Sequence, residues 1–166
     1  MPGQTITLRL AKENMKFSAG HFTIFGPGDR ERVHGHDFRV GVRVEARVGE
    51  NGLCFDYGLL KQRIVELCRE LNEWMLLPGE SPLLRIEREG ALLHAVFGAE
   101  RIPFLAADVK VLPLANISVE ELARWFLGRL LEDRAQVDAF GIEWLEVDVA
   151  SGPGQGAAMS WRLTDP

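Results

Sequence analysis

The sequence has few of the features that mark specialised classes of protein. Only two cysteines occur in 166 residues, Cys54 and Cys68, and they lack C-x-x-C spacing. Neither a disulfide framework nor a thiolate zinc knuckle is therefore indicated. No run of about 18 apolar residues occurs, and the first thirty residues lack the apolar stretch of a signal peptide. We expect a cytoplasmic protein with no membrane span.

Basic residues are not concentrated in any part of the chain. The net charge is −5, with 19 Lys and Arg residues against 24 Asp and Glu. Nucleic acid is therefore not an expected partner, because duplex-binding proteins present a basic patch. An apolar content of 46% with 26% charged residues is ordinary for a globular protein. The length predicts a single domain over residues 1–166.

Alternation of apolar and polar residues predicts several strands. Residues 5–11 alternate, and a second strand segment covers residues 17–21. The longest alternation starts at His34, where His34, His36 and Phe38 share one face with the valines that follow. Residues 25–32 read as an exposed loop, because glycine, proline and charged residues dominate them.

Two amphipathic helices are also predicted. Asp56 can cap a helix whose apolar residues recur at helical spacing as far as Met75, with Pro78 and Gly79 closing it. Ser118 and Glu121 form a capping box that opens the second helix. Residues 83–114 read as further strands. The pattern indicates an α+β fold with the helices covering one face of an antiparallel sheet.

Three histidines form the main candidate site. His34 and His36 lie at i and i+2 on one strand face, and an antiparallel pairing could bring His21 opposite them. Three neutral nitrogens with an open fourth position are typical of catalytic zinc. The same residues can instead be hydrogen-bonded histidines of a sheet surface. A cupin site is not favoured, because residues 40–42 supply no carboxylate. His94 reads as a core or edge histidine.

Four segments resemble the 6-pyruvoyl tetrahydropterin synthase and 6-carboxytetrahydropterin synthase family. They are F-S-A-G-H at 17–21, V-H-G-H-D-F at 33–38, F-D-Y-G-L-L-K at 55–61 and S-V-E-E-L-A at 118–123. The resemblance implies the tunnelling fold, a four-stranded antiparallel sheet with two helices on one face, here with an inserted β-rich segment at about 79–114. It also implies Zn2+ on His21, His34 and His36, and a homo-oligomer, either a trimer or a hexamer.

The catalytic positions of the family are changed in this chain. The loop at 29–33, where the resemblance places a catalytic cysteine before H-G-H, reads D-R-E-R-V. The Asp-His pair of the family falls on Asn72 and Glu73. A carboxylate must then accept the proton, and Glu31 and Glu73 are the candidates. Each can also be an ordinary surface glutamate.

The substrate-binding positions are changed as well. Ser151 matches the glutamate that anchors the pterin ring, Ser118 matches a threonine, and Glu120 is retained. The resemblance therefore suggests a zinc-dependent protein with lyase or aldolase-type chemistry on a dihydroneopterin-type substrate. The alternative is a non-catalytic or re-purposed homologue that binds zinc and another ligand.

Overall fold

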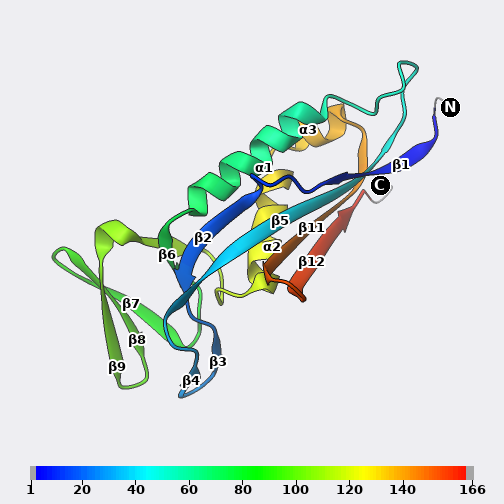
Figure 1. Ribbon diagram of the computed structural model, residues 1–166. Coiled ribbons are helices and arrows are strands. Elements are labelled where there is room, and N and C mark those ends of the chain that lie inside the picture. The colour runs from blue at the N-terminus through cyan, green and yellow to red at the C-terminus, as the bar shows by residue number, and fades with distance from the viewer. Residues whose placement is uncertain (1–2, 164–166) are drawn as a thin grey trace.

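The computed structural model describes residues 3–163, and its centre is a long antiparallel sheet (Figure 1). β5 (His34–Arg47) lies between β2 (Lys16–His21) and β11 (Ile142–Gly152), while β12 (Gln155–Arg162) pairs with β11. β1 (Thr5–Leu10) also pairs with β5, beyond the end of β2. The α+β class expected from the sequence is confirmed.

Among the described residues, this sheet has seven strands and is mixed, which differs from the expected four antiparallel strands. β6 (Trp74–Pro78) runs parallel to β2, and β10 (Val109–Leu112) runs parallel to β6. The predicted helix as far as Met75 is wrong, because α1 (Tyr57–Leu71) ends four residues earlier. Glu73 takes a left-handed backbone with φ of 63° and donates its N–H to the Ser18 carbonyl at 2.7 Å. This contact directs the chain into β6.

Helices cover one face of the sheet (Figure 1). α1 begins where the Asp56 carboxylate accepts the Gly58 N–H at 2.9 Å, and Ser118 is the N-cap of α2 (Val119–Leu131), as predicted. These side chains satisfy N–H groups that the first helical turn leaves free. A short third helix, α3 (Arg134–Ala139), was not predicted from the sequence.

The main core lies between this sheet face and the helices. Along β5 the alternating residues Phe38, Val40, Val42 and Val44 are all buried, which confirms the predicted apolar face. The Phe38 ring stacks on Phe17 of β2 at 5.0 Å between centroids. Each fully buried residue of this kind stabilises the fold by about 1.5 to 3 kcal/mol. The core therefore begins at Phe38, next to the two histidines on the same face of β5.

A second, smaller apolar cluster lies beside the end of the main sheet. A three-stranded sheet is formed by β7 (Leu84–Glu89), β8 (Leu92–Phe97) and β9 (Glu100–Leu105), followed by a 3-10 turn at Ala106–Asp108. The segment expected as a loop contains a small hairpin of β3 (Ile24–Gly26) and β4 (Asp29–Arg30). The cluster includes Phe22, Ile24, Leu77 and Phe97. The hairpin after His21 is thus packed against the extra sheet.

His94 is buried in β8, in agreement with its interpretation as a core or edge histidine. Within residues 3–163, no helix combines the length and apolar character needed to cross a membrane.

Candidate metal centre

Strand register brings the three histidines together. His21 of β2 is the partner of His34 of β5, and Ala19 is the partner of His36. Paired residues of an antiparallel ladder project from the same face, so all three imidazoles share the face that packs on the helices. The ring centroids of His21 lie 4.6 Å from His34 and 5.2 Å from His36. The small Ala19 side chain lies opposite His36 within this group.

The nitrogens of the three rings converge. One ring nitrogen from each histidine lies within 4.8 Å of the other two. The Nε2 atoms of His34 and His36 are 3.0 Å apart. Two nitrogens bound at about 2.0 to 2.1 Å to one tetrahedral ion lie about 3.3 Å apart, so this spacing is close to that of two ligands of one ion.

Backbone carbonyls set which nitrogen is free in two of the three rings, those of His21 and His34. His21 Nδ1 lies 2.9 Å from the Ile117 carbonyl, and His34 Nδ1 lies 2.7 Å from the Arg32 carbonyl. A carbonyl oxygen only accepts, so each Nδ1 carries the hydrogen and donates it. In a neutral ring this leaves Nε2 unprotonated, which is the form that binds a metal.

The Nε2 atom of His21 provides the test of whether a metal fits. This atom is buried and has no hydrogen-bond partner among the residues that the structure describes. A buried polar atom without a partner costs about 1 to 3 kcal/mol. Burial lowers the pKa of His21, and the nearby His34 and His36 lower it further. The Ile117 hydrogen bond and Glu31 act in the opposite direction, but the net pKa is lowered. A neutral ring with an unpartnered lone pair fits a divalent ion.

Glu31 lies beside the histidines. Its Oε2 atom is 3.9 Å from His34 Nε2 and accepts the Thr23 N–H at 2.9 Å. The Glu31 N–H in turn donates to the Thr23 carbonyl at 2.8 Å. Burial raises the pKa of Glu31, but the Thr23 hydrogen bonds and the nearby histidines lower it, and the net pKa is lowered. The carboxylate is therefore held in place at the edge of the cluster.

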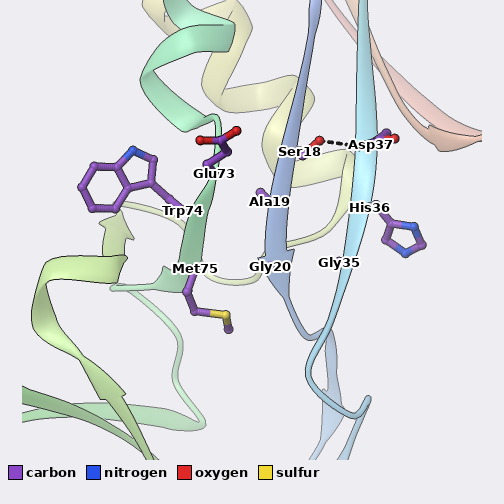
Figure 2. A pocket seen from close by; sticks show the side chains of 9 residues that line it. All are labelled: Ser18, Ala19, Gly20, Gly35, His36, Asp37, Glu73, Trp74 and Met75. Atoms are coloured by element: carbon purple, nitrogen blue, oxygen red, sulfur yellow. Dashed lines mark hydrogen bonds between the residues drawn. The ribbon is translucent and has the colours of Figure 1, made fainter.

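Glu73 occupies a different surface. It lines a hollow of about 480 Å3 with Ser18, Asp37 and Trp74, and His36 belongs to the same lining. In Figure 2, β2 and β5 lie between the Glu73 carboxylate and the His36 ring. The His36 ring points away from the hollow. The Ser18 hydroxyl donates to the Asp37 carboxylate on this side. The structure thus places Glu31, but not Glu73, beside the imidazole nitrogens.

The three predicted substrate-binding residues lie on two other elements. Ser118 accepts the Glu121 N–H at 3.4 Å as the cap of α2 and directly follows Ile117, whose carbonyl holds His21. Glu120 is exposed in the first turn of α2. Ser151 lies where the register of β11 shifts, next to Ala150, the partner of Arg39.

The cysteines lie away from the histidines. Cys54 donates to the carbonyl of Ala46, near the end of β5 opposite to His34. Cys68 is buried in α1, where burial raises the pKa of its thiol to about 12. A thiol with such a pKa is protonated at neutral pH and is a poor proton acceptor.

Sequence analysis missed the backbone and amide groups that hold the site. The Ile117 and Arg32 carbonyls orient two histidines, and Thr23 holds Glu31. The Asn116 side chain makes three hydrogen bonds next to them. Main-chain groups carry no side-chain signal in a sequence. Only Asn116, two residues before the capping-box serine, is a polar side chain that the sequence could have offered as a clue.

The fold and the site together define an α+β protein with a sheet-borne group of three histidines that could hold a metal ion. The chain belongs to the 6-pyruvoyl tetrahydropterin synthase family, whose sequence profile matches residues 10–160.

Individual relatives agree with this assignment. A Methanocaldococcus jannaschii protein, described provisionally as a 6-carboxy-5,6,7,8-tetrahydropterin synthase, is 27% identical over 144 residues, which is 86% of this chain and 88% of that protein. The 6-pyruvoyl tetrahydropterin synthase of Plasmodium falciparum has a similar structure, with a TM-score of 0.91 and 25% identity over 96% of this chain and 99% of that one. The Plasmodium vivax enzyme with its catalytic residue, a glutamate, replaced by alanine shares the fold, with a TM-score of 0.92 and 24% identity over the same shares.

Proposed function

We propose that this protein is a zinc-dependent enzyme of the 6-pyruvoyl or 6-carboxytetrahydropterin synthase type, acting on a dihydroneopterin-type substrate by lyase or aldolase-type chemistry. The observation that supports it most is the buried, unpartnered Nε2 of His21 in a group of three histidines whose ligand nitrogens lie within 4.8 Å of one another. Zinc is the expected ion, because three neutral imidazoles leave a fourth position for a substrate oxygen. Bound zinc polarises such an oxygen and makes a neighbouring proton easier to remove.

In this proposal Glu31 is the proton acceptor. Its lowered pKa keeps the carboxylate ionised at neutral pH, so the accepting form is present. The same lowered pKa makes the carboxylate a weak base, so in this proposal the zinc must make the substrate proton more acidic. Thr23 occupies one direction of Oε2, and the remaining lone pairs of the carboxylate can accept a substrate proton. The replaced catalytic residue of the Plasmodium vivax enzyme is also a glutamate.

The remaining predicted residues have less direct support. Glu73 stays a candidate proton carrier because it lies at the family's histidine position, although it faces another hollow. Ser118, Glu120 and Ser151 are proposed to contact the substrate. We also propose a homo-oligomer, a trimer or a hexamer, as the resemblance implies. Sedimentation of a stable monomer at micromolar concentration would contradict the oligomer.

The proposal is tested by incubating the zinc-loaded protein with 7,8-dihydroneopterin triphosphate, and separately with its dephosphorylated form, under exclusion of oxygen. Chromatography of the pterin products distinguishes elimination of the triphosphate from cleavage of the side chain. We expect Glu31→Gln, assayed at a zinc concentration that saturates both proteins, to lower turnover by about 10²- to 10⁴-fold, the usual contribution of a general base. Glu50→Gln, in the exposed turn after β5, is the matched control.

Tests of the two glutamates must be separate. Full turnover in Glu31→Gln would remove this residue from the mechanism, and full turnover in Glu73→Gln would remove the second candidate. Zinc content measured on each variant shows whether lost turnover reflects lost metal.

A re-purposed zinc-bearing, ligand-binding protein is the second candidate function. The hydroxyl of Ser151 supports it, because a hydroxyl cannot make the paired, charge-assisted bonds of a carboxylate to a pterin ring. Tight zinc binding without calorimetric binding of a dihydropterin would favour this function. A strong dihydropterin complex would count against it.

A further inference from the structure

Asn116 makes an unusually complete set of bonds beside the histidine centre. Its Oδ1 atom accepts the Ile24 N–H at 3.1 Å and the Ile117 N–H at 3.0 Å. Its Nδ2 atom donates to the Ile24 carbonyl at 2.8 Å. Ile24 and Ile117 are both buried, so these backbone groups have limited access to water. One amide side chain therefore joins the hairpin after His21 to the segment that enters α2.

Both joined segments lead directly to the site. Ile117 supplies the carbonyl that accepts the His21 Nδ1–H. Ile24 follows Thr23, whose N–H and carbonyl hold the carboxylate and the main chain of Glu31. The His21 imidazole is thus bonded to Ile117, which Asn116 contacts directly. The Glu31 carboxylate is bonded to the residue that precedes Ile24, the other residue that Asn116 contacts.

We propose that Asn116 is a positioning residue, which fixes the Glu31 carboxylate and the His21 imidazole relative to each other through Ile24 and Ile117. The inference rests on the proposed function in that it assumes zinc on the three histidines. Asparagine suits this position because its amide both accepts and donates. Aspartate would keep the two accepted bonds and lose the donated one, and leucine would lose all three at similar size.

Zinc affinity tests the inference without any substrate. It is measured by competition with a chelator for wild type, Asn116→Leu and Asn116→Asp, well below the unfolding temperature of each. Removing a group that orients a metal ligand from outside typically weakens binding about 10- to 100-fold. We expect Asn116→Leu in that range and Asn116→Asp between it and wild type. Asn51→Ala, which loses one loop bond to the Leu53 N–H, should change zinc affinity less than about twofold.

A double-mutant cycle tests the link to Glu31. Glu31→Gln removes a negative charge close to His34, so it should weaken zinc binding in the wild-type background. If Asn116 holds the carboxylate there, the same change should have a smaller effect in Asn116→Asp. The absorption of bound Co2+ gives an independent view of the ligand geometry, and its bands should shift in both Asn116 variants.

The outcomes separate this inference from the proposed function. Zinc affinity within about twofold of wild type in both Asn116 variants, or full additivity with Glu31→Gln, would overturn the inference alone. A wild-type protein that binds no zinc would overturn the proposed function and the inference with it. A purely structural role would lower the unfolding temperature and leave both zinc affinity and the Co2+ bands unchanged.

Discussion

Replacing His21 by leucine should make stability independent of zinc while changing the metal-free protein little. In the metal-free fold, His21 is only 4% exposed and its Nε2 atom has no partner within the described residues. Leucine removes this cost of about 1 to 3 kcal/mol. It also removes the hydrogen bond to the Ile117 carbonyl, and a buried carbonyl without a donor destabilises the fold by a similar amount. The two changes oppose each other, so the metal-free stabilities should agree within about 2 kcal/mol.

If the protein binds zinc as proposed, zinc should change this balance for the wild-type protein only. At a zinc concentration 100 times its dissociation constant, binding stabilises the folded state by about 2.7 kcal/mol. For a chain of this length, that corresponds to a rise in unfolding temperature of about 5 to 11 °C. The leucine variant keeps two of the three ligands and should show little of this rise at the same zinc concentration.

Thermal unfolding followed by circular dichroism, with zinc and with a chelator, measures both numbers. A zinc-induced rise of the same size in His21→Leu would show that His21 is not a ligand. A metal-free variant destabilised by more than about 3 kcal/mol would show that the unpartnered nitrogen is not costly, which would refute the energetic reasoning.

Three further predictions concern the scaffold. Burial raises the pKa of Asp148, assisted by Glu146 and opposed by Arg43. A protein that holds an acid with a raised folded pKa loses stability as pH rises through that pKa. Asp148→Asn should therefore stabilise the protein at pH 7 and lose this advantage below about pH 4, as urea unfolding across pH would show. A Cβ at Gly41 would overlap only the Asp148 carboxylate, at the end of a rotatable side chain. Gly41→Ala should therefore destabilise by about 1 kcal/mol or less, and the effect should disappear in an Asp148→Ala background. Phe126, fully buried beneath the sheet, should cost about 3 to 5 kcal/mol as alanine in the same assay, and a smaller loss would mean that the core repacks.

Side-chain periodicity was sufficient to predict the half of the site that lies on β5. Strict alternation places His34 and His36 on the apolar face, and the structure has them there. Predicting that His21 pairs with His34 would have required the register of the two strands. The length of the connection between them does not determine this register. Thr23 accepts the Glu31 N–H across a small hairpin. The glycines and charged residues of this segment had indicated a loop instead.

The error at the end of α1 has a local and a distant cause. Apolar residues continue at helical spacing to Met75, so periodicity alone extends the helix. The backbone instead turns at Glu73, whose N–H bonds to Ser18, and Met75 pairs with Gly20 in the sheet. Tertiary pairing thus overrides a short stretch of helical pattern, and the mixed sheet follows from it.

The arrangement of the three histidines has a consequence for the order of folding. His21, His34 and His36 lie within sixteen residues, on two strands that pair across one short connection. β1 pairs with the far end of β5, and β11, which lies along its other edge, begins only at Ile142. Local pairings form before distant ones, because closing a short loop costs less chain entropy. If the histidines hold the proposed ion, we therefore expect a β2–β5 hairpin to bind it before the sheet is complete. The Ile117 carbonyl would then arrive later and lock the orientation of the His21 ring.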